Sequence, residues 1–439
     1  MKLLTILIFL LFSNWIFAQK EFIPDPIQKR GKKFIFVDFI QAKHQFIIKQ
    51  ISKKIIVKSK IIFQSDIKGY PLFDFSIRPK KITLNGKTAK IKKIRILGNY
   101  TRNASIPFTF FWGIKKRISS GTHTLEMEHE LKKGVSFRPF SLRFWYWDLV
   151  GKHFLNKYLP TNMEFDQYPI TMEFKSSENL LDTLDFESNA YKLIKSEGNR
   201  ILEYPKHLSA SSVYLHIHQK NKFPIKEFTF VNIENKSIPI RVYADKISLL
   251  KDIQTKITNE LQELESVFGV WPHPNLLLYL HPSNENHNYE YAGAFESSLK
   301  SMPHEIFHGY FSRSMTPADG NSGWIDEAIA EWRDSGYPKL KSLSKNKASN
   351  LACNNKYRQR TVKESYSKGR DFISHLDYLF NQKELIFSDF LKLFLKKHKH
   401  KVINTSIFIR ESSDYYGEDL KKKFCYFVCN KSTLKGCKL

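Results

Sequence analysis

The chain has 439 residues, of which 42% are hydrophobic and 14% aromatic, with only 18 glycines and 17 prolines. This composition excludes a mainly disordered chain, a collagen-like or low-complexity protein, and a small disulfide-stapled scaffold. Lysine and arginine number 70 against 43 aspartate and glutamate residues, which gives a formal net charge of +27. The length exceeds that of one compact domain, so we expect two or three.

The positive charge alone would attract nucleic acid, anionic lipid or acidic polymers. The lysines, however, are spread along the chain, with short basic runs at residues 396–401 and 421–423. No arginine-rich helix, zinc-finger spacing or RNA-binding aromatic motif accompanies them. We therefore interpret the charge as solvated surface lysine and expect no nucleic-acid partner.

The first 18 residues have the pattern of a secretory signal peptide. A positive start is followed by an apolar run from Leu3 to Phe12, and Ala18 supplies a small residue for cleavage. The run is too short to span a bilayer, and no later stretch reaches the length of a membrane helix. We expect an exported protein, periplasmic or extracellular, with no integral membrane segment once residues 1–18 are removed.

Residues 19–240 are predicted to form a β-rich region. Short β-branched or aromatic runs recur, as in residues 34–39, and apolar side chains alternate with polar ones over residues 123–131. Asn85 and Gly86 stand between two such runs, which is a strong hairpin signal. The pattern predicts an N-terminal antiparallel β domain of sandwich or saddle type.

The periodicity becomes helical near residue 243. Apolar residues from Leu250 to Phe268 recur at steps of three and four, which predicts a helix of about 22 residues. Gly269 would end this helix. The apolar run at residues 276–280 then predicts a buried strand.

Beyond residue 345 most apolar residues keep helical spacing, so we expect a helical C-terminal region over residues 346–439. Helices are predicted at residues 371–380 and 387–395. The region also holds all four cysteines of the chain, which are Cys353, Cys425, Cys429 and Cys437. In an exported protein they predict two disulfides that tie down the tail, with all three pairings open.

The most informative segment is a His-Glu-x-x-His pattern formed by His304, Glu305 and His308. Residues four apart lie on one face of a helix, so both imidazoles can reach one cation at about 2.0–2.1 Å. Glu305 would point beside the ion and can hold a water molecule whose pKa the metal lowers. The pattern predicts metal ligands at His304 and His308 and a general base at Glu305.

A catalytic zinc usually takes three protein ligands. Eighteen residues, 309–326, separate His308 from Glu327, which lies within a second short helix predicted around residues 324–332. Two helices joined by such a turn can bring Glu327 against the two histidines. Glu331 follows one helical turn later, and we expect it to accept the free ring N–H of a ligand histidine.

This spacing resembles the gluzincin metallopeptidases and, within them, the aminopeptidase N family. The resemblance rests on the two histidines, Glu305, and Glu327 inside a Trp-Ile-Asp-Glu-Ala segment. It implies that His304, His308 and Glu327 bind one Zn²⁺ per chain and that Glu305 is the general base. It also implies a thermolysin-like zinc catalytic domain, which we assign to residues 241–345.

Two further motifs extend the resemblance. Residues 366–369 match a Tyr-x-Lys-Gly motif, in which the tyrosine donates to the developing oxyanion, and this implies that role for Tyr366. Residues 293–297, Gly-Ala-Phe-Glu-Ser, resemble the Gly-Ala-Met-Glu-Asn exopeptidase motif, whose glutamate binds the substrate α-amine. That role would fall to Glu296, with Glu290 as the alternative carboxylate.

The sequence thus predicts an α+β multidomain protein, with an N-terminal antiparallel β sandwich or saddle, a thermolysin-like zinc domain and a helical C-terminal region. The predicted function is that of an exported, zinc-dependent metallopeptidase of aminopeptidase type, acting on peptides or proteins. Two alternatives stay open. One is an endopeptidase on the same zinc site, and the other is a non-catalytic surface-binding protein with a degenerate peptidase fold.

Overall fold

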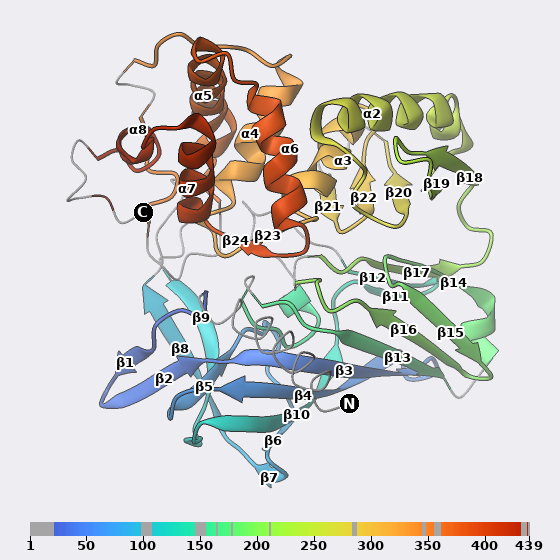
Figure 1. Ribbon diagram of the computed structural model, residues 1–439. Coiled ribbons are helices and arrows are strands. Elements are labelled where there is room, and N and C mark those ends of the chain that lie inside the picture. The colour runs from blue at the N-terminus through green and yellow to red at the C-terminus, as the bar shows by residue number, and fades with distance from the viewer. Residues whose placement is uncertain are drawn as a thin grey trace, which may run out of the picture.

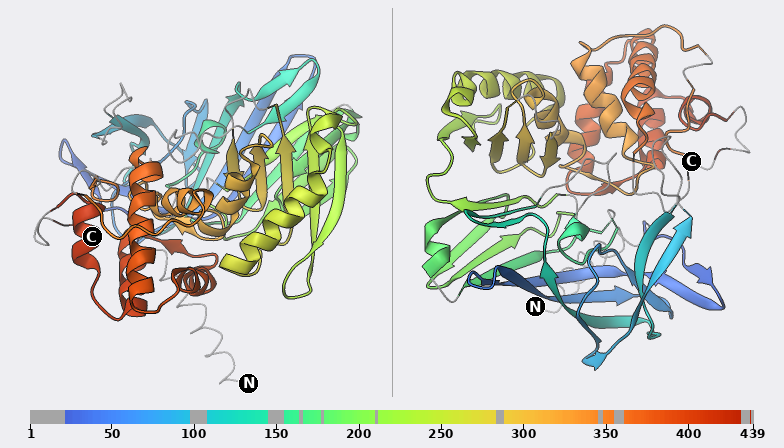
Figure 2. Two further views of the ribbon diagram at one scale, coloured as in Figure 1. Left: turned by 90° about the horizontal axis from the view of Figure 1, so that it is seen from above. Right: turned by 180° about the vertical axis from the view of Figure 1, so that it is seen from behind.

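The computed structural model describes residues 22–97, 108–144, 155–163, 166–176, 179–209, 212–282, 288–344, 348–354, 361–431 and 437. The protein is built in two tiers (Figure 1). In that view, sheets of the N-terminal half form the lower tier, while the upper tier holds a smaller sheet and the long helices. Figure 2 presents the same two tiers from behind. The signal peptide predicted for residues 1–18 lies outside the described residues.

The largest sheet of the lower tier has eight strands in the order β15-β16-β13-β3-β4-β10-β6-β7. Its strands are β3 (Asp38–Lys49), β4 (Lys54–Ser65), β6 (Lys81–Leu84), β7 (Lys87–Thr88), β10 (Gly121–Leu131), β13 (Ile170–Ser176), β15 (Lys192–Ser196) and β16 (Asn199–Tyr204). Buried and more exposed side chains alternate along β4, as in a half-buried strand. Asn85 and Gly86 turn between β6 and β7 with φ of 52° and 69°, so the predicted hairpin is confirmed.

Two smaller sheets complete the lower tier, in the orders β1-β2-β5-β9-β8 and β11-β12-β17-β14. Their strands are β1 (Ile27–Lys29), β2 (Lys32–Phe36), β5 (Tyr70–Phe73), β8 (Ile91–Leu97), β9 (Phe108–Ile114), β11 (Val135–Phe137), β12 (Phe140–Arg143), β14 (Leu184–Ser188) and β17 (Leu215–Gln219). Most neighbours are antiparallel, as predicted, but β3 pairs with β13 and β2 with β5 in parallel. Long connections separate these partners, and they allow the chain to return in the same direction.

The sheet of the upper tier has the order β18-β19-β20-β22-β21. Its strands are β18 (Ile225–Val231), β19 (Ser237–Ala244), β20 (Leu276–Leu280), β21 (Tyr289–Tyr291) and β22 (Ala294–Ser297). β20 is the predicted buried strand, and all of its residues are buried. β18 and the start of β19 precede residue 241, so this sheet begins before the boundary expected at residue 240. Alternation of side chains does not reveal which sheet a strand will join, and the expected boundary is therefore too late.

Helix α2 (Ile253–Phe268) packs against this sheet and is shorter than predicted. The residues before it form the 3₁₀ turn η3 (Ile247–Leu250), and Asp252 then adopts a left-handed φ of 55°. The helix therefore begins only after Asp252, although the apolar spacing starts earlier. Gly269 ends it with a φ of 90°, as its position predicts.

The remaining helices lie in the upper tier and share one apolar core with α2 and the sheet. They are α3 (Met302–Phe311), α4 (Trp324–Asp334), α5 (Arg370–Gln382), α6 (Phe387–His398), α7 (Thr405–Tyr416) and α8 (Lys421–Phe427). The shorter elements are the 3₁₀ turns η1 (Leu155–Lys157) and η2 (Asn179–Thr183), the π-helical turn η5 (Ser365–Gly369), and the paired strands β23 (Thr316–Pro317) and β24 (Val402–Ile403). The two C-terminal helices predicted from spacing are confirmed as α5 and α6. Among the described helices, none has the length and apolar character needed to cross a membrane.

Two disulfides hold the C-terminal tail. Cys353 pairs with Cys429, 76 positions later, and Cys425 pairs with Cys437. The first bond ties the segment before α5 to the end of α8, so that the helices between them form one closed loop. Such a bond stabilises the fold chiefly by restricting the unfolded chain. All four cysteines are thus used, in one of the three pairings that the sequence left open.

Candidate zinc site

Helix α3 carries the His-Glu-x-x-His motif. Pro303 lies in its first turn, where the missing N–H would have no partner within the helix. Ile306 and its apolar neighbours are buried in the upper-tier core. Gly309 allows a close approach to Trp271, since a Cβ at that position would lie 2.5 Å from the indole ring. Packing of the apolar helix face therefore fixes the direction of the histidines on the other side.

Helix α4 and the turn η5 bring two further residues to α3. The side chain of Trp324 is buried at the start of α4 and anchors that helix in the core. Gly369 lets η5 lie directly on α4, because a Cβ there would be 2.7 Å from the Cβ of Ala328. This close contact presents Glu327 from α4 and Tyr366 from η5 to the same place.

His304, His308 and Glu327 come together in space. The Nε2 atoms of the two histidines lie 3.1 Å apart, and each lies 3.8 Å from Oε2 of Glu327. Donor atoms at about 2.0–2.1 Å from a tetrahedral zinc ion are about 3.3 Å apart. The three predicted ligands therefore stand at the mutual spacing that a single zinc ion requires.

The site opens to solvent on one side. The side chains of His308 and Glu327 are 3% exposed, whereas that of His304 is 20% exposed. Water and substrate can therefore approach past His304. Three protein donors also leave one tetrahedral position for a further ligand, as in zinc sites that catalyse reactions.

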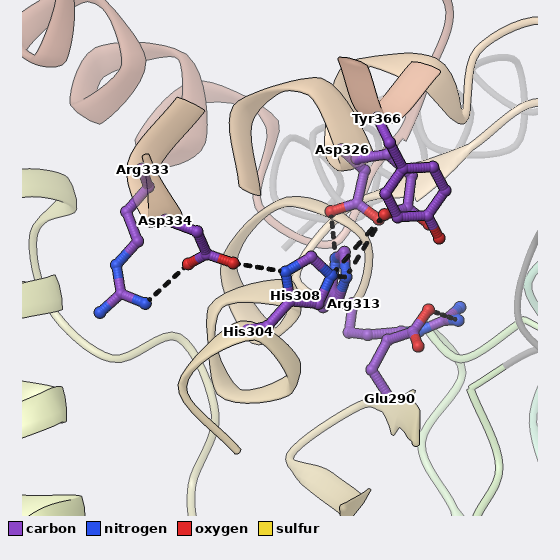
Figure 3. Close-up of polar contacts among 9 residues, drawn as sticks. Glu290, His304, His308, Arg313, Asp326, Arg333, Asp334 and Tyr366 are labelled. Carbon is purple, nitrogen blue, oxygen red and sulfur yellow. Dashed lines mark hydrogen bonds and ion pairs between the residues drawn. The ribbon is translucent and has the colours of Figure 1, made fainter. Parts of the chain in front are cut away.

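Two aspartates hold the outer nitrogens of the histidines (Figure 3). Nδ1 of His304 donates to Asp334 at 2.6 Å, and Nδ1 of His308 donates to Asp326 at 2.7 Å. An ionised carboxylate only accepts, so Nδ1 of each ring carries a proton and Nε2 is the nitrogen that faces the metal position, where a metal ion would displace any proton. Burial alone would lower the pKa of His308, but Asp326 raises it well above its usual value. This excess of negative charge around two imidazoles favours a bound cation.

Asp334 and Asp326 take the place that the sequence predicts for Glu331. At about 100° per residue, Glu331 is rotated about 40° from Glu327 around the helix axis, while Asp334 and Asp326 are rotated about 20° and 100° in the opposite sense. Because α3 lies on that opposite side, the two aspartates reach the imidazoles. The expectation for Glu331 is therefore corrected. The seven-residue spacing from Glu327 is the sequence signal that would have found Asp334.

Arg333 connects the site to helix α2. Its guanidinium donates to Asp334 at 3.1 Å, to Glu263 at 2.7 Å and also to Glu260. Burial would raise the pKa of Asp334, but His304 and Arg333 lower it below its usual value, so the carboxylate stays ionised. The orientation of the imidazole of His304 thus depends on a chain of contacts that ends on α2.

Two buried carboxylates lie beside His308. Glu305 is 6% exposed, and Glu290, on the edge strand β21, is 4% exposed. One donor atom from each of these three residues lies within 4.8 Å of the other two. Glu305 is therefore next to the three-donor cluster without belonging to it. That is the position from which a carboxylate can act on water held by the metal.

Glu290 is ion-paired with Arg313, which follows the end of α3 (Figure 3). The guanidinium lies 2.6 Å from Oε1, and the two side chains are only 4% and 2% exposed. Burial would raise the pKa of Glu290, but Arg313 outweighs it and keeps the pKa below its usual value. No motif in the sequence marks Arg313, because its partner comes from a separate strand.

The hydroxyl of Tyr366 donates to Oε1 of Glu327 at 2.8 Å. The other carboxylate oxygen, Oε2, faces the two histidines. The tyrosine of the Tyr-x-Lys-Gly motif therefore lies at the edge of the predicted metal position. It reaches that place because η5 packs so closely on α4.

Glu296 lies on the opposite face of the upper sheet from the histidines. In the pairing of β21 with β22, Glu290 is opposite Phe295, and Tyr289 is opposite Glu296. Paired residues share a face and neighbours alternate, so Glu290 points to the helices and Glu296 to the lower tier. There Glu296 is 1% exposed and ion-paired with Arg143. The prediction that Glu296 meets the substrate amine is wrong, and Glu290 is the carboxylate beside the zinc residues.

Comparisons with known proteins support the fold. No family model and no curated protein matches the sequence. Aminopeptidase A of Legionella pneumophila, solved with aspartic acid, matches with a TM-score of 0.62 and 13% identity over 89% of this chain and 49% of that one. The chain has the fold of the M1 zinc metallopeptidases. It thus spans about half the length of the Legionella protein.

Two other M1-type structures are covered more fully. The M1 zinc metallopeptidase of Deinococcus radiodurans matches with a TM-score of 0.60 and 13% identity over 90% of this chain and 95% of that one. Native LTA4 hydrolase from yeast matches with a TM-score of 0.62 and 13% identity over 89% and 68%. The mixed α/β fold, with several sheets and a helical C-terminal region, agrees with the multidomain M1 fold. At such low identity the likeness establishes the fold, and the chemistry is argued from this chain's own residues.

Proposed function

We propose that this protein is an exported zinc-dependent metallopeptidase, with one Zn²⁺ per chain. The observation that carries the proposal is the cluster of His304, His308 and Glu327, whose donor atoms are 3.1–3.8 Å apart. A buried carboxylate, Glu305, stands beside this cluster. The fold shared with M1 zinc metallopeptidases supports the same assignment.

The two histidines and Glu327 would hold the metal, with Asp334 and Asp326 orienting the rings. When bound, zinc supplies Lewis-acid polarisation of the scissile carbonyl and lowers the pKa of a water molecule. The two Nε2 atoms, the carboxylate of Glu327 and the open fourth position all suit this ion. Peptides or proteins are the proposed substrates.

Glu305 is the proposed general base. It lies within 4.8 Å of His308, outside the set of ligands, and therefore close to where the attacking water must sit. We propose that it takes the proton from the water and passes it to the leaving amine. A purely structural metal site needs no such base, which counts against a non-catalytic role.

Tyr366 is the proposed donor to the oxyanion that forms when the scissile carbonyl is attacked. Its hydroxyl already lies at the ligand Glu327, at 2.8 Å, and so at the edge of the reacting position. Such a donor stabilises charge that appears only in the transition state. Tyr366→Phe should therefore lower kcat by about 10²- to 10³-fold with KM little changed.

The aminopeptidase assignment needs a carboxylate for the substrate amine, and Glu290 is now the candidate. It lies on the edge strand beside Glu305 and His308. Its ion pair with Arg313, however, offsets its charge, and this favours the alternative of an endopeptidase on the same zinc site.

The proposed function is tested with Glu305→Gln, using Glu331→Gln as a matched control on the neighbouring helix. We expect Glu305→Gln to keep its zinc but to lose about 10²- to 10⁴-fold in peptide hydrolysis. Glu331→Gln should retain both its zinc and its peptide hydrolysis, since Asp334 and Asp326 orient the histidines. Metal analysis of the purified proteins and turnover of a peptide library supply the readouts. Full activity in Glu305→Gln, or wild-type protein that takes up no zinc, would refute the proposal.

A further inference from the structure

The ion pair between Glu290 and Arg313 is buried within the zinc site. The guanidinium is 2.6 Å from Oε1 of Glu290, and both side chains are nearly inaccessible. Glu290 also has a carboxylate oxygen within 4.8 Å of donor atoms of Glu305 and His308. The pair therefore borders the proposed reaction site, and it includes the carboxylate named above as the candidate partner of a substrate amine.

The charge of this pair decides what it can recognise. A lone buried carboxylate is a strong partner for a substrate ammonium group and rejects substrates that lack one. With Arg313 in contact, the local sum is zero instead of minus one. A guanidinium directly behind the carboxylate also repels an incoming ammonium. A neutral amide, in contrast, loses nothing by approaching a neutral pair.

The contrast with Arg143 and Glu296 argues against a purely structural reading of Arg313. That other pair lies on the far face of the same sheet, among tyrosines and away from the zinc ligands. It already joins the sheet to the lower tier. The Arg313 pair instead lies beside Glu305 and His308, two residues of the proposed reaction site.

We propose that Arg313 is a specificity-determining residue that neutralises Glu290, so that the site accepts peptides whose N-terminal side carries no charge. The substrates would be N-acylated peptides or internal peptide bonds, in addition to free peptides. This inference rests on the proposed peptidase function and selects its substrate class.

The test measures binding separately from turnover. Zinc-loaded Glu305→Gln serves as the inactive parent, titrated calorimetrically with three peptides that differ only in a free, acetylated or succinylated N-terminus. We expect the Kd values for the free and acetylated peptides to agree within about tenfold. All titrations are made at pH 7, where the free N-terminal amine of a peptide is mostly protonated. In the wild type, the kcat/KM values for the free and acetylated peptides should likewise agree within about tenfold.

Three variants in this parent assign the effect to the pair. Arg313→Met should unmask Glu290 and raise the preference for the free amine at least tenfold at pH 7. Glu290→Gln should unmask Arg313 and favour the succinylated peptide. The double variant Glu290→Gln/Arg313→Met carries neither charge and should behave like the parent, and thermal melting of each variant verifies its fold.

Several results would overturn the inference. One is a Kd of the parent for the acetylated peptide that exceeds its Kd for the free peptide by more than about a hundredfold. This result alone would suffice, without any further variant. Others are an unchanged preference in Arg313→Met, or a parent that binds none of the three peptides. If the parent binds without discrimination but the wild type cleaves nothing, the inference stands and the proposed catalytic function fails.

Discussion

On the helix face of the upper sheet, Glu290 pairs with Arg313, and on the lower-tier face Glu296 pairs with Arg143. Both pairs are buried. On the lower-tier face the guanidinium of Arg143 lies 4.5 Å from the ring centroid of Tyr279. The hydroxyls of Tyr214 and Tyr243 bond to each other there. The ion pair and the hydroxyls on that face thus contact other residues of the same face.

The helix face differs in one respect. Donor atoms of His304, His308 and Glu327, which come from two helices, lie there within 4.8 Å of one another. Burial raises the pKa of Tyr214 to about 12, so the tyrosines of the lower-tier face stay neutral at physiological pH. Buried charge alone therefore does not identify a reaction site. A reaction site is identified instead by several donor atoms that converge and leave a position open for a further ligand.

The largest expected effect is on the helix face. Replacing His304 with Ala removes one of three ligands, and we expect zinc content and peptide hydrolysis to be lost together. His123→Ala, in the lower tier, is the matched control and should keep both. Metal analysis by mass spectrometry and a peptide assay measure the outcome. Retention of stoichiometric zinc in His304→Ala would contradict the ligand assignment.

The lower-tier face should respond in stability rather than in chemistry. Arg143→Met leaves Glu296 buried without its partner, and we expect a loss of about 3–5 kcal/mol in the free energy of unfolding. The zinc content of the folded protein should not change. An apolar double replacement, Arg143→Met/Glu296→Leu, should recover part of the loss. If Arg143→Met keeps its stability but loses activity, the assignment of stability to the lower-tier face and of chemistry to the helix face is wrong.

An intermediate effect is expected for the aspartates behind the histidines. Asp334→Asn should weaken zinc binding by about 10- to 100-fold, because it no longer fixes the ring proton of His304. Glu331→Gln, on the same helix, should leave the affinity unchanged. Competition with a chelator of known affinity measures both. Equal losses in the two variants would restore Glu331 to the role that the sequence predicted for it.

The smallest effect concerns acid stability. Burial, and then Arg143, lowers the pKa of His216 on the lower-tier face well below its usual value. In the unfolded chain this histidine binds a proton below about pH 6.5, while in the folded protein it resists protonation. The free energy of unfolding should therefore fall as the pH drops below about 6.5, by at most about 1.4 kcal/mol per pH unit from this residue. His216→Gln should flatten that slope in denaturant titrations, and an unchanged slope would exclude the assignment.

Local patterns in the sequence were enough to predict much of the site. The four-residue spacing of His304 and His308 needs only one helical turn, and the helix around Glu327 follows from its own apolar residues. The same holds for the Asn85-Gly86 hairpin and for helices α5 and α6. In each of these cases the cause lies within a few positions of the effect.

The rest depended on packing between distant segments. Glu290 and Glu296 are six positions apart in similar apolar surroundings, and only the register of β21 against β22 decides which of them faces the histidines. Asp334 rather than Glu331 meets His304 because of the rotation of α4 against α3. Arg313 meets Glu290 only because the end of α3 lies on the edge strand. Local sequence therefore determined which chemical groups this protein carries, whereas tertiary structure decided which of them meet, because strand register and helix rotation are set by the whole core.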